Sequence, residues 1–117
     1  MSQSVLLSLA RKSIEEVLRA ERTINRTEFL EKYPILNEIM GTQITLYLND
    51  KIRGRATTQS PTRSLLDDII YNAKIAAFQD PVFTPIVTSE YLSIAIELIL
   101  FTAEGPLSHT DTPILKE

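Results

Sequence analysis

Alternating apolar and polar residues between Gln43 and Leu48 constrain the fold more than any other feature. The run is rich in β-branched residues, and Ile44, Leu46 and Leu48 fall on one side of it, which is typical of a strand with one buried face. Turn-forming residues follow at 49–51, and apolar residues recur beyond them. The sequence therefore predicts a β-hairpin.

The length of the hairpin loop decides which side chains share a face of the sheet. A two-residue loop sets Leu48 against Lys51, whereas a three-residue loop sets Leu48 against the apolar Ile52, so we expect the longer loop. That register also sets four further pairs opposite one another: Leu46–Gly54, Ile44–Ala56, Tyr47–Arg53 and Thr45–Arg55. The two arginines then share the outward face, about 6.6 Å apart along the strand.

Two segments have the periodicity of amphipathic helices. Apolar residues recur at helical spacing from Ser4 to Ala20, and Ser4 is suited to cap the first turn. A second helix is predicted from Leu65 to Phe78, with Thr62 or Ser64 as its N-cap. These two are the main helices of the chain.

The other segments are shorter or less regular. We expect a short helix over 27–33 that begins at an N-cap provided by Thr27, and an ordered corner at the prolines of 80–85. After Ser93, the segment 93–101 is apolar except for Glu97, which suits a central strand covered on both faces. Residues 105–117 contain two prolines and little pattern, so we expect a single domain over 1–104 followed by a loosely ordered tail.

Composition excludes several kinds of chemistry. A chain of 117 residues with 44% hydrophobic and 23% charged residues suits one globular domain. A net charge of −3 gives no general attraction to nucleic acid or to an anionic membrane. The absence of cysteine excludes disulfides, thiolate metal sites and cysteine nucleophiles. The apolar stretch near the N-terminus is too short for export or membrane spanning, so we expect a cytoplasmic protein, with no metal or cofactor.

A group of basic and hydroxyl residues is the best candidate binding site. Its members lie within thirteen residues that contain no acid: Lys51, Arg53, Arg55, Thr57 and Arg63. Cations and hydroxyls beside a helix N-terminus are what a phosphate or carboxylate ligand needs. The alternative is that these are solvated strand and loop residues, with Arg53 stacked on Tyr47.

Three single residues lead to further expectations. Glu97 interrupts an apolar strand, so we expect it to pair with Arg53 or Arg55 rather than to act as a general base. Gly54 inside a strand indicates a close approach, which we expect from the helix that follows. His109, the one histidine, falls in the predicted tail and is expected to be exposed.

Four segments also form an ordered series of motifs. They are Gly41–Leu46 (GTQITL), Ile52–Gly54 (IRG), Asn72–Ala73 and Ala76–Pro85 (AAFQDPVFTP). The series resembles the AMME-syndrome candidate protein family, known in bacteria as AmmeMemoRadiSam system protein A. The resemblance covers nearly the whole chain but only about the first half of a typical member. It implies an α+β fold, with a small, mostly antiparallel sheet flanked by two main helices.

The chain departs from the family at the hairpin. Family members carry Leu-Arg-Gly-Cys-Ile-Gly where this chain reads Ile52–Thr57, so the family cysteine falls on Arg55 and the second glycine on Thr57. A thiol role is therefore not carried over. Genomic association of the family suggests work beside a radical enzyme and a Memo-type partner.

Two classes of function follow. The first is a non-catalytic member that acts in protein interaction or small-ligand binding, as a homodimer or with another protein, because a face that longer relatives cover is expected to stay exposed. The alternative is an enzyme or cofactor-handling protein that holds an anionic substrate through Arg53 and Arg55. The acidic balance disfavours binding of single-stranded nucleic acid.

Overall fold

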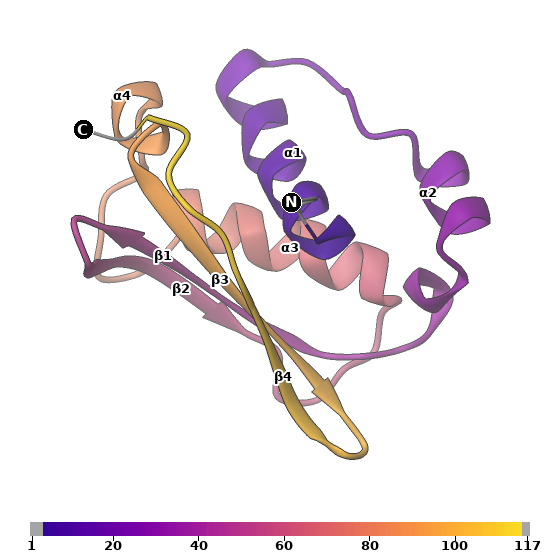
Figure 1. The fold of residues 1–117 in the computed structure, drawn as a ribbon. Coiled ribbons are helices and arrows are strands. Elements are labelled where there is room, and N and C mark those ends of the chain that lie inside the picture. The colour runs from indigo at the N-terminus through magenta and orange to yellow at the C-terminus, as the bar shows by residue number, and fades with distance from the viewer. Residues whose placement is uncertain (1–3, 116–117) are drawn as a thin grey trace.

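The computed structural model describes residues 4–115, which form a four-stranded antiparallel sheet with helices packed on one face (Figure 1). The elements are α1 (Val5–Arg19), α2 (Arg26–Lys32), the 3-10 helix η1 (Pro34–Asn37), β1 (Thr42–Leu48), β2 (Lys51–Thr57), α3 (Leu65–Phe78), α4 (Thr88–Tyr91), β3 (Ile94–Thr102) and β4 (Gly105–Thr110). The strands lie in the order β2-β1-β3-β4. The predicted α+β architecture is confirmed.

Both main helices begin where their capping residues predict. The Ser4 hydroxyl accepts a hydrogen bond from the Leu6 amide at 3.2 Å, and α1 follows. The Ser64 hydroxyl accepts from the Asp67 amide at the start of α3. In α2 the cap is Asn25, whose side-chain Oδ1 accepts from the Glu28 amide, rather than the predicted Thr27.

The helices and the inner face of the sheet enclose the apolar core. Its fully buried members include Leu9, Ile14, Ile44, Leu46, Leu66, Ile69, Ile96 and Leu98. Gly54 allows α3 to pack directly on β2, because a Cβ atom at this position would lie 2.0 Å from the carbonyl oxygen of Ala76. The predicted approach of the helix over Gly54 is therefore confirmed.

The outer face of the sheet has no helix on it in the region 4–115 (Figure 1). Along β3, Ile96 and Leu98 are buried while Glu97 and Ile99 are only half-buried. The expectation of a strand covered on both faces is wrong.

The hairpin follows the predicted register only in the half that lies away from its loop. The pairs Leu46–Gly54, Ile44–Ala56 and Thr45–Arg55 are confirmed, but a bulge leaves Arg53 without a residue opposite. The loop then has two residues, Leu48 pairs with Lys51, and Ile52 pairs with Tyr47. Both loop residues, Asn49 and Asp50, have the positive φ that a tight hairpin turn requires. Ile52 therefore lies on the outer face rather than in the core.

The expected loose tail is wrong for residues 105–110, which form β4 against β3. The strand turns back at Gly105, where φ is +124°, and Thr102 donates a hydrogen bond to the Gly105 carbonyl at 2.6 Å. Pairing with β3 supplies the order that the local sequence does not show. Residues 116–117 of the predicted tail lie outside the described residues.

Candidate functional site

The structure does not bring the predicted basic cluster together. Lys51 and Thr57 lie at opposite ends of β2, and Thr57 donates a hydrogen bond to the Gln43 side chain. Arg63 lies beyond the strand, with its guanidinium 4.0 Å from the centre of the Tyr71 ring. Each of these residues therefore has different surroundings.

Arg53 reaches away from the sheet toward the segment between α3 and α4. Its Nε and Nη2 donate to the Glu90 carboxylate at 3.2 and 3.0 Å, and its Nη1 donates to the Thr84 carbonyl at 2.8 Å. The guanidinium lies 5.7 Å from the centre of the Phe83 ring. Its hydrogen bonds to Glu90 lower the pKa of that carboxyl group.

The predicted partners Glu97 and Tyr47 therefore do not contact Arg53, which the bulge turns toward another segment. They contact each other instead, since the Tyr47 hydroxyl lies 3.3 Å from Glu97 Oε1 and donates a hydrogen bond to it. Arg55 does not pair with Glu97 either. Its Nε donates to the Thr45 hydroxyl at 3.0 Å, and Thr45 is fully buried between its neighbours.

Asp80 binds the free edge of β2. One carboxylate oxygen accepts from the Arg55 backbone amide at 3.0 Å, and the other accepts from the amides of Val82 and Phe83. Burial alone would raise the pKa of Asp80, but the three amide donors lower it below its ordinary value. The motif segments around Gly54 and Asp80 thus meet at one edge of the sheet, which we call the β2 edge.

A buried polar cluster joins α3 to the sheet. Asp68 is fully buried, and its carboxylate accepts from the hydroxyls of Thr42 at 2.8 Å and Thr58 at 2.7 Å. The side-chain Nδ2 of Asn72 also donates, to the carbonyl and hydroxyl oxygens of Thr42 and to the hydroxyl of Thr58. Sequence reasoning missed this cluster, although Asp68 and Asn72 stand four residues apart on the buried side of α3. The contacts anchor the 58–64 loop.

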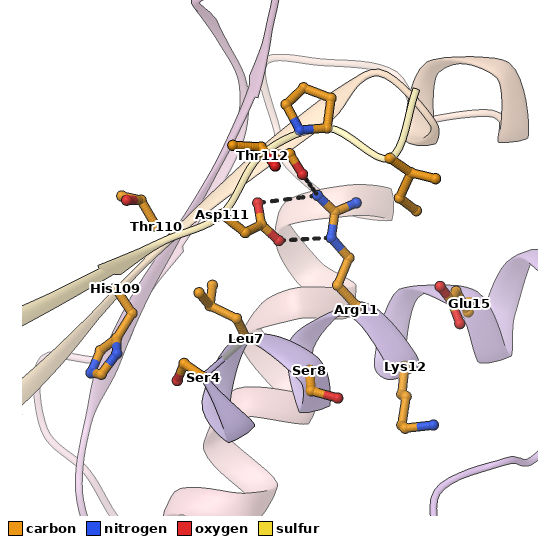
Figure 2. Close-up of a pocket in the computed structure, with 12 residues that line it drawn as sticks. Ser4, Leu7, Ser8, Arg11, Lys12, Glu15, His109, Thr110, Asp111 and Thr112 are labelled. Atoms are coloured by element: carbon orange, nitrogen blue, oxygen red, sulfur yellow. Dashed lines mark hydrogen bonds and ion pairs between the residues drawn. The ribbon is translucent and has the colours of Figure 1, made fainter. Parts of the chain in front are cut away.

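Arg11 was also missed. It is 6% exposed and forms a two-point ion pair with Asp111, at 2.9 and 3.1 Å, from the segment after β4 (Figure 2). Its Nη2 also donates to the Ile94 carbonyl at 2.6 Å. Because the partner lies 100 residues along the chain, no local pattern signals the pair. The guanidinium of Arg11 thus links α1 to the start of β3 and to the segment that follows β4.

A groove of about 700 Å³ runs between α1 and residues 109–114, with Arg11 and Asp111 at its base (Figure 2). The guanidinium of Arg11 lies 5.1 Å from the centre of the Tyr91 ring, and the Tyr91 hydroxyl donates to Glu15 at 2.6 Å. Burial and the contact with Glu15 raise the pKa of Tyr91. His109 lines this groove and is half-buried in β4, whereas an exposed position in a loose tail was expected.

Comparisons with known proteins agree with these motifs. The AMMECR1 family model matches residues 7–115. The chain belongs to this family. A protein of Methanothermobacter thermautotrophicus is 31% identical over 113 residues, which are 94% of this chain and 58% of the relative. One of Thermococcus onnurineus is 36% identical over 110 residues, covering 86% and 53% of the two chains.

A solved structure shares the fold. The crystal structure of the uncharacterised protein PH0010 of Pyrococcus horikoshii is similar to this chain with a TM-score of 0.74 and 29% identity, over 84% of this chain and 50% of that one. This chain therefore spans about half the length of the relatives that it matches. Within residues 4–115, no helix is long and apolar enough to cross a membrane, and no three acidic or histidine side chains are grouped to hold a metal ion.

Proposed function

We propose that this chain is a non-catalytic member of the family that works as a protein-interaction domain, in the form of a homodimer. The outer face of the sheet carries the proposal. Ile52 and Phe101 on that face are 41% and 39% exposed, and Tyr47 and Ile99 are half-buried. Apolar and aromatic side chains on a sheet with helices on its other face favour association with a second surface.

The arrangement of charges supports a binding role for the same face. Arg53 is held by Glu90 and Thr84 at the β2 edge. Arg55, in contrast, is exposed on the outer face beside Thr45. Exposed arginine and tyrosine side chains are common anchors of protein interfaces.

Sedimentation velocity tests the proposed homodimer. One chain has a mass of 13.2 kDa, and we expect a species of about twice that mass when the protein is in the micromolar range. A single species with the mass of one chain across this range contradicts the proposal. The predicted cytoplasmic location is independent of this test and stays a prediction.

A second candidate function is an enzyme or cofactor-handling protein that binds an anionic ligand. One observation favours it: within residues 4–115, Arg55 Nη1 and Nη2 donate to no protein acceptor. A ligand at a hundred times its dissociation constant adds about 2.7 kcal/mol and raises the melting temperature by roughly 10 °C. We expect such a shift from phosphate compounds, nucleotides or carboxylates in the wild type and not in Arg55→Ala, if this candidate is right.

Arg53→Ala is the matched comparison for that screen. Because Arg53 is engaged with Glu90, its loss should lower the melting temperature without ligand and leave the ligand-dependent shift unchanged. Equal shifts in the wild type and in Arg55→Ala would reject an anion site at Arg55.

A further inference from the structure

Opposite charges flank the central row of the outer sheet face. The strand register places Arg55 of β2 and Glu97 of β3 directly opposite Thr45 of β1, from its two sides. Neighbouring strands are about 4.8 Å apart, so the two charged residues are roughly 10 Å from each other along this row. The row therefore runs from positive to negative across the middle of the face.

Both charged side chains keep part of their hydrogen-bonding capacity. Arg55 uses Nε to bind the Thr45 hydroxyl, and Glu97 uses one oxygen to accept from Tyr47. Among residues 4–115, no protein group hydrogen-bonds the Arg55 terminal nitrogens or Glu97 Oε2. These atoms are the ones that a charge-assisted pair with another surface would use.

We infer that two copies of this chain pack face to face through their outer sheet faces, about a two-fold axis that runs parallel to β1 above Thr45. A rotation of 180° about this axis exchanges the β2 side with the β3 side. Arg55 of each copy then lies over Glu97 of the other, and the pair occurs twice, as a closed two-fold interface requires. An axis across the strands would set Arg55 over its own equivalent, which like charges disfavour.

The same rotation matches the neighbouring rows. Ile52 of one copy faces Ala95 of the other, and Thr57 faces Ile99, since these residues stand at equal distances on the two sides of β1. Tyr47 lies on the axis and faces its equivalent. Packed sheets are about 10 Å apart, a gap that an arginine and a glutamate together can span. The charge pairs thus lie between a row with Ile52, Tyr47 and Ala95 and a row in which Thr57 faces Ile99.

The size of the face sets the expected strength of the dimer. With the axis above β1, three strands of each copy overlap, namely β2, β1 and β3, and six residues per strand give a shared face of roughly 15 by 20 Å per copy. Two such faces bury roughly 600 Å², less than the area of about 1,200 Å² in stable interfaces, so a weak dimer with a dissociation constant of about 10 to 100 micromolar is expected. This inference rests on the proposed homodimer through the outer face and adds the symmetry axis and the Arg55–Glu97 pairs.

Charge exchange tests the axis. We would make Arg55→Glu and Glu97→Arg and measure the mass of each by sedimentation velocity, from about 1 to 300 micromolar. Each variant sets like charges opposite one another twice, so each should dissociate at least about 100-fold more readily than the wild type. An equimolar mixture of the two variants should form a heterodimer. In it, each of the two contacts between positions 55 and 97 again joins a glutamate to an arginine.

Matched controls separate charge from folding. Arg22→Glu and Glu31→Arg make the same changes at exposed residues away from this face, and both should dimerise like the wild type. Circular dichroism checks that every variant is folded. If a charge-reversed variant does not fold, Arg55→Gln and Glu97→Gln replace it, with an expected weakening of about 10-fold each.

The possible results lead to different conclusions. Monomeric single variants whose mixture dimerises support the inferred axis. Single variants that remain dimeric overturn the axis but leave the proposed homodimer in place, on another surface. Single variants that are monomeric alone and in mixture overturn the Arg55–Glu97 pairing. A wild type that is monomeric over the whole range overturns both proposals.

Discussion

The two faces of the sheet differ in the interactions that hold their side chains in place. On the inner face, Ile44, Leu46, Ile96 and Leu98 are almost fully buried beneath α1 and α3. On the outer face, Arg55, Thr45 and Glu97 form a polar row between half-exposed apolar residues. The inner face is fixed by the removal of apolar surface from water, whereas the outer face is organised by side chains that contact one another across strands.

This difference bears on function. The four buried residues of the inner face are explained by the stability of this chain, because they belong to the core that the helices of the same chain cover. Arg55 is not needed to balance a buried carboxylate, since Glu97 is half-buried and bonded to Tyr47. Binding is therefore expected on the outer face, and substitutions on the two faces should have different effects.

The largest effect is expected at the buried ion pair between Arg11 and Asp111. Arg11→Met removes the cation that holds Asp111, where both side chains are 7% exposed, and should lower the free energy of unfolding by about 3 to 5 kcal/mol. Urea denaturation measures the loss. Lys12→Met, at the exposed neighbouring position, should change it by less than about 0.5 kcal/mol. Equal effects would show that burial of Arg11 is unimportant.

A methyl group on the inner face of β2 should be nearly as damaging. Gly54→Ala forces α3 away from the sheet, because the new Cβ atom would overlap the Ala76 carbonyl oxygen, and we expect a loss of at least about 3 kcal/mol. Thr57→Ala, on the same strand but exposed, should cost less than about 1 kcal/mol. A Gly54→Ala protein with an unchanged urea midpoint would contradict the close packing of α3.

Two adjacent residues of β3 compare the faces directly. Leu98→Ala leaves a cavity in the core and should cost about 3 kcal/mol, whereas Ile99→Ala on the outer face should cost about 1 kcal/mol. The difference of about 2 kcal/mol should be measured at sub-micromolar protein concentration, where association is weak. Equal losses would mean that the outer face is covered as fully as the inner one.

The smallest predicted effect depends on pH. The pKa of Glu90 in the folded chain is lowered from 4.5 by Arg53, so its contribution is fully present above pH 4.5 and is lost as the pH falls through the folded value. Glu90→Gln should therefore cost about 1 kcal/mol near neutral pH and almost nothing in strong acid. Urea titrations at several pH values measure this, with Glu31→Gln as an exposed control. A pH-independent loss would mean that Glu90 acts through packing.

Sequence reasoning succeeds where neighbours in the chain decide the outcome. The limits of α3 follow from Ser64 and the apolar periodicity, and the pairs around Gly54 follow from alternation along β1. The family resemblance adds the antiparallel sheet. The bulge at Arg53 is not predictable in this way, because it depends on contacts with Glu90 and Thr84, more than thirty residues further along.

The missed elements have partners that are distant in sequence. β4 contains a proline and several exposed residues, and only its pairing with β3 makes it a strand. Arg11 interrupts an apolar stretch of α1, which by itself indicates a surface position. Its burial depends on Asp111, and Asp111 is brought to it by β4. Because residues 105–110 were predicted to be a loose tail, the burial of Arg11 against Asp111 could not be predicted either.

The carboxylate of Asp80 has one more consequence. Exposed strand edges are templates on which further chains add, the route by which sheet proteins grow into fibrils. At the β2 edge, the Arg55 amide that an incoming strand would need is already bound by Asp80. Addition of a strand from another copy at this edge would first have to break the hydrogen bond to Asp80, so the β2 edge is a poor site for open-ended polymerisation.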